Sequence, residues 1–285
     1  MSRVYEALRQ FQDDTGAQAS ILDPDNFLAT EAAPHPTTAN GTIAWDEIAS
    51  FEPHPKSESR VVTLTDDNSL GAEKFRLLRA RIRHIRETQQ VRRFVVTSAV
   101  PDEGKTLVSI NLAIALAQHT TDRVLLLEGD LRKPTFAQYL NMPNVAGLDD
   151  WFSSNSPVTK FLHHLDDLQL WLLPAGVPQE NPVMILQSAR FAELYNELSA
   201  AFDWIVIDAP PLLPMVDVNF WSRKSDGLLL VSRQGRTPKL ALKKGLEVLD
   251  HPKVLGVVIN DSPAVENSYY HHYYYGTSKS FPRKK

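Results

Sequence analysis

Cysteine is absent from the 285 residues of this chain. A disulfide framework and a thiolate metal site are therefore both excluded, and the absence is compatible with a reducing compartment. Long apolar runs are missing too, because no stretch of about 18 apolar residues predicts a membrane-spanning helix. The first ten residues, MSRVYEALRQ, also lack the apolar core of a signal peptide. We therefore expect a cytoplasmic protein.

An excess of positive charge is also lacking. The chain has 30 lysines and arginines against 34 aspartates and glutamates, a formal net charge of -4. This balance argues against a generally nucleic-acid-binding surface, although RLLRARIRHIR forms a local basic stripe. Hydrophobic residues make up 43% of the sequence, which is enough for a sizeable core. We expect a globular protein without a nucleic-acid partner.

The composition divides the chain into three parts. Residues 1–60 contain a short amphipathic helical pattern followed by a polar segment punctuated by proline, which predicts a poorly ordered linker. Residues 61–265 alternate apolar runs with helical patterns and form the predicted domain. Residues 266–285 are rich in tyrosine, histidine, serine and lysine, and we expect a flexible tail.

Short and nearly continuous apolar runs predict strands that are buried on both faces. Segments with helical periodicity lie between most of them. This alternation predicts an α/β fold with a mostly parallel sheet and helices on both of its faces. The predicted strands are 93–98, 123–128, 168–173, 204–208, 227–232 and 254–260, and the clearest helical segments are 105–118, 188–202 and 239–250.

A phosphate-loop motif follows the first of these strands, in TSAVPDEGKTLVSINLA. Gly104, Lys105 and Thr106 close the loop, and Ala99 stands where the first glycine is usual. Such a loop directs backbone N–H groups at phosphate oxygens, while its lysine reaches the terminal phosphates and its hydroxyl binds magnesium. A chance G-K-T at a strand–helix turn is the alternative, but the strand, loop and helix all fit.

Two further members of the loop are acidic, and we expect their side chains to point outward while the backbone binds phosphate. The predicted nucleotide-binding residues are Ala99, Pro101, Asp102, Glu103, Gly104, Lys105, Thr106 and, beyond the loop, Arg132.

Acidic residues end two other predicted strands. RVLLLEGDLRKP supplies Glu128 and Asp130, and WIVIDAPP supplies Asp208. Ligands of open α/β sheets lie outside the carboxyl ends of the strands, so these carboxylates are expected to face the loop and to hold magnesium or orient an attacking hydroxyl. Each one alone could be a solvated or capping carboxylate. The predicted catalytic residues are Lys105, Glu128, Asp130 and Asp208, and the predicted magnesium ligands are Thr106, Asp130 and Asp208.

Taken together, these motifs resemble the bacterial P-loop tyrosine autokinases that regulate capsule and exopolysaccharide synthesis. The resemblance rests on AVPDEGKT as Walker A, on LLLEGDLR as the second acidic motif and on IVIDAPP as Walker B, and it covers about residues 70–260. A further family motif, E-x-x-R-x-x-R, is present as Glu73, Arg76 and Arg79. The resemblance implies a P-loop NTPase architecture like that of MinD and ParA.

The same resemblance implies that ATP and Mg²⁺ are used and that the E-x-x-R-x-x-R helix joins subunits into a ring. It also implies a membrane adaptor of the chain-length-regulator type, which activates the kinase and recruits it to the inner face of the plasma membrane, and a cognate tyrosine phosphatase. A solvated basic helix that packs through Phe75, Leu78 and Ile82 is the alternative interpretation of this segment.

The tail holds five of the eight tyrosines of the chain. The resemblance implies that one subunit's tail enters the active site of its neighbour, and that phosphorylation disassembles the ring. Each phosphate adds roughly -1.5 to -2 charges, so a modified cluster becomes strongly anionic. A sticky low-complexity tail and, through His271 and His272, a metal-binding tract are the alternatives. The predicted autophosphorylation sites are Tyr269, Tyr270, Tyr273, Tyr274 and Tyr275.

Three residues depart from the family pattern. Glu128 stands in place of aspartate, Ala209 in place of serine or threonine, and Asp102 adds an acid to the loop. These departures keep open a second hypothesis, a nucleotide-binding regulator of the same export machinery that does not phosphorylate. ParA- and MinD-type ATPases are a third, but Val100 occupies the position of their signature lysine.

Overall fold

The computed structural model describes residues 43–142, 145–213, 217–248 and 253–262. They form an eight-stranded sheet with the strand order β1-β4-β5-β3-β6-β2-β7-β8. Every neighbouring pair is parallel except β4 and β5. The strands are β1 (Ala49–Phe51), β2 (Arg93–Ser98), β3 (Val124–Glu128), β4 (His163–Leu165), β5 (Leu170–Leu173), β6 (Trp204–Asp208), β7 (Gly227–Arg233) and β8 (Val254–Asn260).

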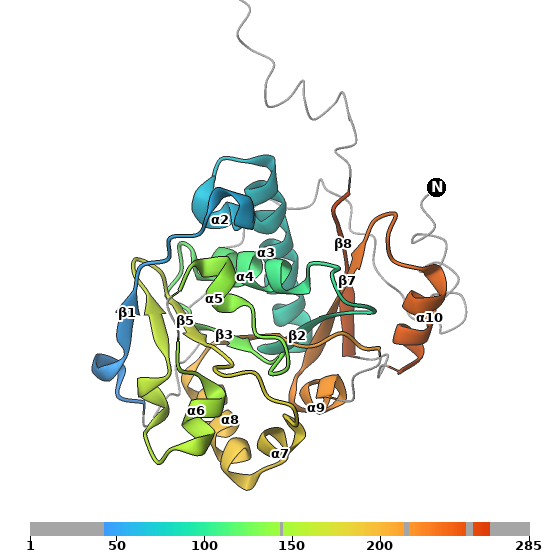
Figure 1. Cartoon of the computed structure of the whole chain (residues 1–285). Coiled ribbons are helices and arrows are strands. Elements are labelled where there is room, and N and C mark those ends of the chain that lie inside the picture. Colours follow the sequence, from blue (N-terminus) through green and yellow to red (C-terminus); the bar gives the residue numbers. More distant parts are fainter. Residues whose placement is uncertain (1–42, 143–144, 214–216, 249–252, 263–285) are drawn as a thin grey trace, which may run out of the picture.

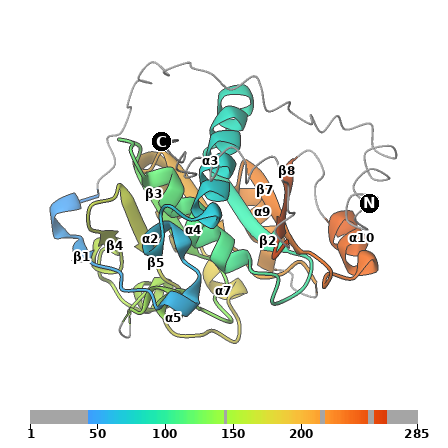
Figure 2. The same ribbon diagram turned by 90° about the horizontal axis from the view of Figure 1, so that it is seen from above.

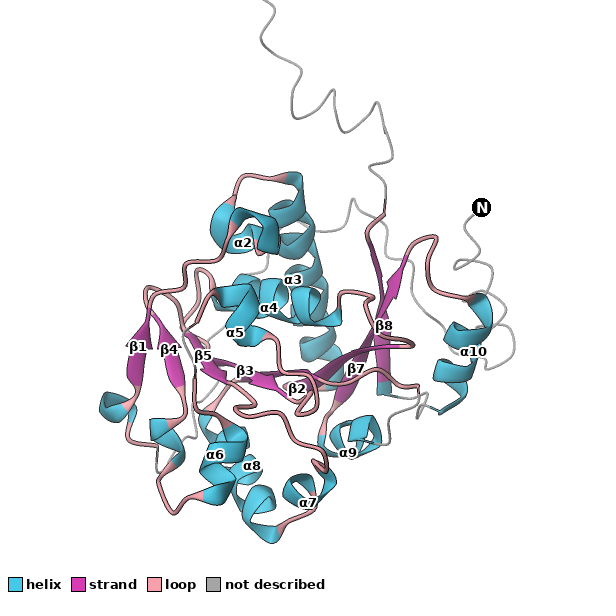
Figure 3. Ribbon diagram, in the orientation of Figure 1, coloured by secondary structure: helices cyan, strands magenta, loops and turns pink. Residues whose placement is uncertain are grey.

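Helices cover both faces of this sheet, as Figure 1 and Figure 3 show. The mostly parallel α/β architecture predicted from the sequence is thereby confirmed. The helices are α2 (Val62–Thr65), α3 (Leu70–Gln89), α4 (Lys105–Ala117), α5 (Phe136–Leu140), α6 (Leu148–Ser153), α7 (Val183–Leu186), α8 (Ala189–Ala201), α9 (Asp217–Lys224) and α10 (Lys239–Val248). Short 3₁₀ turns cover Trp45–Glu47, Ser57–Ser59 and Val158–Lys160.

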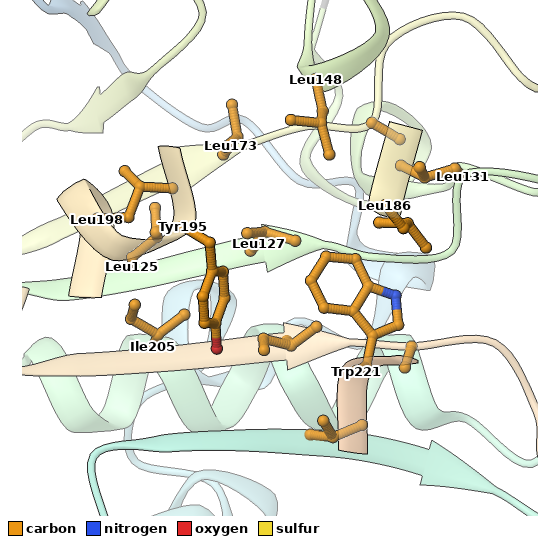
Figure 4. Close-up of a cluster of buried hydrophobic side chains, with 14 of the residues drawn as sticks. Leu125, Leu127, Leu131, Leu148, Leu173, Leu186, Tyr195, Leu198, Ile205 and Trp221 are labelled. Atoms are coloured by element: carbon orange, nitrogen blue, oxygen red, sulfur yellow. The ribbon is translucent and has the colours of Figure 1, made fainter. Parts of the chain in front are cut away.

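Two hydrophobic cores lie on opposite faces of the sheet, because alternate strand residues point to opposite sides. On one face, Tyr195 of α8 and Trp221 of α9 pack against the strand residues Leu127 and Ile205 (Figure 4). On the other face, α4 is almost completely buried, and α3 lies over it (Figure 2). The central strands and the helix α4 that packs on them are buried. They therefore form a rigid support for the loops at the carboxyl ends of the strands.

The sheet extends further toward the N-terminus than the sequence pattern indicated. Residues 1–60 were expected to form a linker, but in the part that the structure describes, β1 pairs with β4 at the sheet edge. Trp45 anchors this segment, since its ring centroid lies 5.1 Å from the ring centroid of Trp171 and 5.4 Å from that of Phe202. A three-residue strand has too few positions to show periodicity, so no strand could be predicted there.

None of the helices in the described ranges is both long enough and apolar enough to cross a membrane.

Candidate active site

The phosphate loop connects β2 to α4 at the carboxyl edge of the parallel strands. Gly104 is the N-cap of α4 and has a φ of 86°, a left-handed conformation that glycine adopts without strain. No side chain caps this helix. The first N–H groups of α4 therefore lack a side-chain acceptor, and together with the helix dipole they make a site suited to an anionic phosphate.

Lys105, the first residue of α4, places its ammonium group among acidic side chains. Its Nζ lies 2.9 Å from Asp130 Oδ2 and 3.8 Å from Asp208 Oδ2, and its side chain is only 12% exposed. Burial acts to lower the pKa of Lys105, but the carboxylates of Asp208 and Asp130 outweigh it and raise that pKa above its ordinary value. The lysine is thus held as a cation at the end of the helix.

Asp208, at the end of β6, is fully buried. Its Oδ2 accepts a 2.7 Å hydrogen bond from Thr106 Oγ1, and its Oδ1 accepts a 3.2 Å bond from Ser109 Oγ. Thr106 and Asp208 were both predicted as magnesium ligands, whereas the sequence offered no signal for Ser109, which lies one turn further along α4. Magnesium prefers oxygen ligands and usually combines one or two carboxylates with waters and phosphate oxygens. The hydroxyl of Thr106 with the carboxylates of Asp208 and Asp130 fits that preference.

Glu128, at the end of β3, takes a different position from the one expected of a catalytic base. Its carboxylate accepts backbone N–H groups from Thr135, Phe136 and Ala175, and only 2% of the residue is exposed. Burial raises the pKa of Glu128 to about 7, although these three N–H groups oppose the shift. Glu128 therefore ties the segment after β3 to the loop after β5, and of the two acids that follow β3 it is Asp130 that contacts Lys105.

The Glu128→Gln variant is expected to reveal this buried carboxyl through pH. A raised pKa means that the stabilisation from Glu128 is fully present below its ordinary value of 4.5 and is lost as the pH rises through about 7. The free energy of unfolding of the wild type minus that of the variant should fall by about 2–3 kcal/mol from pH 4.5 to pH 8. Urea unfolding at both pH values measures this difference. The Glu193→Gln variant, at an exposed position on α8, is the control. If the difference in the free energy of unfolding did not change with pH for either variant, the assignment would be contradicted.

The two acidic residues inside the loop differ from each other. Asp102 is exposed, as expected, and has a φ of 63°. Glu103 was also expected to point outward, but it is 2% exposed, and its Oε2 accepts the N–H groups of Ala99 at 3.0 Å and Val100 at 3.3 Å. The expectation was wrong for Glu103 because an acid inside the loop can bind the N–H groups of the loop itself. Pro101 lies exposed at its tip.

Arg132 is engaged on the other side of the site. Its Nε donates to Asp217 Oδ2 at 2.8 Å, and its Nη1 donates to the carbonyl oxygen of Glu180 at 2.6 Å. Asp217 is 2% exposed and begins α9. Asp217 was not predicted from the sequence, because the pairing joins residues 85 positions apart. Arg132 thereby links the loop after β3 to α9.

The E-x-x-R-x-x-R residues lie along the first half of α3. Arg76 bonds to Glu73 at 2.8 Å and to Asp67 at 3.0 Å. Arg79 Nη1 donates to the carbonyl oxygens of Ala115 and Gln118 at 3.1 and 3.3 Å, so it caps the C-terminus of α4. Arg79 thus also holds α4, the helix whose other end forms the candidate phosphate site. The expected role of the motif in oligomer contacts stays a prediction.

The tyrosine cluster lies outside the described residues. The strand that precedes it, β8, ends at Asn260, which is paired with Arg233 at the end of β7. Because β7 and β8 are parallel to β2, the chain leaves the sheet at the same edge as the phosphate loop. The end of β8 therefore lies next to the candidate site, where Asn260 Nδ2 donates to the carbonyl oxygen of Glu103 at 2.9 Å.

Comparison with known proteins places these features in context. The chain is 32% identical over 231 residues to the tyrosine-protein kinase YwqD of Bacillus subtilis (strain 168), which covers 80% of this chain and 96% of that protein. It is 31% identical over 237 residues to the succinoglycan biosynthesis transport protein ExoP of Rhizobium meliloti (strain 1021), covering 81% of this chain and 30% of that protein. No protein-family model matches the chain.

The fold of this chain is also similar to the folds of solved structures. The chimerical protein CapA2B2 superposes with a TM-score of 0.67 at 31% identity, over 76% of this chain and 94% of that chain. The kinase domain of the Escherichia coli tyrosine kinase ETK gives a TM-score of 0.64 over 83% of this chain and 94% of that chain. At 20% identity the second likeness concerns the fold alone.

Proposed function

Because this chain belongs to the bacterial tyrosine-protein kinases of capsule and exopolysaccharide biosynthesis, we propose that it phosphorylates its own C-terminal tyrosines in trans, with Mg-ATP as the donor. The observation that carries the proposal is the convergence of Lys105, Thr106, Asp130 and Asp208 at the uncapped N-terminus of α4. The kinship favours this activity over a nucleotide-gated regulator that does not phosphorylate.

Phosphoryl transfer depends on positioning and on charge stabilisation more than on covalent chemistry by the protein. The N–H groups at the start of α4 and the ammonium of Lys105 are placed to bind the terminal phosphates and to stabilise the charge that develops on them. Thr106 and Asp208 are the residues to hold magnesium, with Asp130 beside them. Magnesium, when bound, neutralises phosphate charge and orients the oxygen atoms for transfer.

Asp130 is better placed than Glu128 to accept the proton of the incoming tyrosine hydroxyl. The two oxygens of Glu128 together accept three backbone N–H groups. Among the described residues, Asp130 accepts only one, from Lys133 at 3.2 Å, and its Oδ2 faces the Lys105 ammonium at 2.9 Å. The substitution of glutamate for the family's aspartate therefore shifts the expected proton acceptor rather than removing it. The Asp130→Asn variant should lose more kinase activity than Glu128→Gln.

The names of the relatives support a proposal for the biological setting. ExoP is a transport protein of succinoglycan biosynthesis, and YwqD is a tyrosine-protein kinase that matches this chain over most of its length. We infer that this chain acts at the inner face of the plasma membrane beside a separate membrane adaptor that activates it, and that a tyrosine phosphatase reverses the modification. Glu73, Arg76 and Arg79 are the proposed ring contacts between subunits.

Replacement of all five cluster tyrosines by phenylalanine is expected to remove tail phosphorylation while leaving nucleotide binding unchanged. Phenylalanine keeps the ring and removes the accepting hydroxyl. Intact mass after incubation with Mg-ATP should show stepwise additions of about 80 Da per phosphate group in the wild type and none in the variant. Phosphopeptides should map to Tyr269, Tyr270, Tyr273, Tyr274 and Tyr275.

The incubation is made with and without a cytoplasmic adaptor segment. A wild type that binds nucleotide but gains no tyrosine phosphate under either condition would contradict the kinase assignment. Phosphate that persists in the phenylalanine variant would show instead that the acceptor lies elsewhere.

A further inference from the structure

Glu103 is held from two sides by residues at the ends of β7 and β8, far from the phosphate loop in sequence. Its side-chain Oε1 accepts a hydrogen bond from the hydroxyl of Thr237, which follows β7. Its backbone carbonyl accepts a 2.9 Å bond from Asn260 Nδ2 at the end of β8. Within the loop, Glu103 is hydrogen-bonded to Ala99 and Val100. Outside the loop, it is hydrogen-bonded to Thr237 and Asn260.

Both partners are themselves fixed. The Thr237 hydroxyl accepts the N–H group of Arg233 at 2.9 Å and a bond from Ser232 Oγ at 3.2 Å. Its single proton has two acceptors within reach, Glu103 Oε1 and the carbonyl oxygen of Arg233 at 3.1 Å. The Asn260 side-chain oxygen accepts the N–H group of Asp261 at 2.9 Å. Because the side-chain oxygen of Asn260 accepts the N–H group of Asp261, it is the amide nitrogen that faces the loop.

The approach of Asn260 is close as well as directional. A β-carbon added at Gly104 would stand 2.2 Å from Asn260 Nδ2, so the loop and the strand end are in direct packing contact at this point. Gly104 is the N-cap of α4, and the N–H groups that follow it form the proposed phosphate site. A shift of Glu103 would therefore shift the phosphate site as well.

We propose that Thr237 and Asn260 are positioning residues for nucleotide binding. They fix the side chain and the carbonyl of Glu103, and so hold the loop in the form in which the start of α4 faces the phosphates. Neither residue belongs to the phosphate-loop motif, and neither contacts Lys105, Asp130 or Asp208 through the bonds described. The inference rests on the proposed function, because it takes the loop to bind a nucleotide.

Thr237→Val is the decisive variant, since valine keeps the shape of threonine and removes only the hydroxyl. We expect its dissociation constant for ADP with Mg²⁺, measured by titration calorimetry, to rise about tenfold. Thr237→Ser keeps the hydroxyl and should stay within about threefold of the wild type. Asn260→Ala, which deletes the bond to the Glu103 carbonyl, should also weaken binding about tenfold.

The matched control is Thr159→Val at the opposite edge of the sheet. Thr159 is buried and, like Thr237, donates to a glutamate, Glu47 Oε2 at 3.4 Å. We expect this variant to bind ADP as the wild type does. Thermal unfolding of all variants checks that each one folds.

Kinetics separate positioning from general destabilisation. A positioning role raises KM for ATP about tenfold and changes kcat less than about threefold, because binding is weakened uniformly. A merely structural role lowers the amount of active enzyme, and so the apparent kcat, with KM unchanged. If Thr237→Val binds ADP as tightly as Thr237→Ser does, the inference is overturned. A fall in kcat with an unchanged KM for ATP would overturn it too.

The outcomes also distinguish this inference from the proposed function. If the wild type binds ADP but transfers no phosphate to tyrosine, the proposed activity fails while the calorimetry still decides the roles of Thr237 and Asn260. If the wild type binds no ADP, both are overturned.

Discussion

Replacement of Lys105 with methionine is expected to lower the rate of tail phosphorylation about a thousandfold or more. Methionine has a similar length and is apolar, so the change mainly removes the cation. In the wild type this cation is held beside Asp130 and Asp208, and its raised pKa keeps it charged across the physiological pH range. Without it, the phosphates would meet two carboxylates with no compensating side chain. Phosphopeptide spectrometry on the incubated protein measures the loss.

The matched control for this variant is Lys243→Met on α10, because that lysine lies on the exposed face of the helix. It should phosphorylate its tail at the wild-type rate. Lys105→Met also leaves buried acids unpaired, so circular dichroism and thermal unfolding must show that the variant is folded. A folded variant that keeps more than about a tenth of the wild-type rate would contradict the site.

Short-range patterns predicted three of the strands to the residue. The strands 93–98, 204–208 and 254–260 have the predicted bounds in the structure. These segments are buried on both faces or carry continuous apolar runs, so local sequence and tertiary environment agree. The phosphate loop was predictable for the same reason, since its function depends on neighbouring residues in one turn.

The sequence could not reveal features that depend on distant pairings. β1 joins the sheet through a three-residue pairing with β4, and Trp45 is held by rings more than 100 positions away. The side chains of Glu128 and Glu103 were placed by analogy with a motif, but backbone N–H groups decide where they point. For Glu128 these groups belong to other segments of the chain, and for Glu103 they belong to its own loop. A carboxylate in a motif therefore has a predictable location along the chain and an unpredictable partner.

The Asp208→Asn variant tests whether the site is built for function at the expense of stability. Asparagine has the shape of aspartate but no charge, so it loses the magnesium ligand and the partner of Lys105. We expect kcat/KM to fall about a thousandfold. Burial raises the pKa of Asp208 although Lys105 lies close. Its ionised form is therefore disfavoured in the folded state, and at neutral pH the free energy of unfolding of the variant should not fall.

Asp226→Asn provides the opposite signature. Burial also acts to raise the pKa of Asp226, but the hydrogen bonds from the Arg93 side chain and from the N–H groups of Arg92 and Arg93 outweigh it and hold that pKa below its usual range. A lowered pKa means stability that is present above the unfolded-state pKa and lost as the pH falls. This variant should therefore lose about 1–3 kcal/mol of stability at pH 7 and keep its kinase activity.

The two variants together separate a functional carboxylate from a structural one on the same sheet. Asp208 lies at the carboxyl end of β6, beside the start of α4, whereas Asp226 precedes β7 and binds at the amino end of β2. Kinase assays and urea unfolding give the activity and the free energy of unfolding of each variant. If Asp208→Asn were destabilised as much as Asp226→Asn while keeping its activity, Asp208 would serve the fold, and the acid essential for transfer would have to be Asp130.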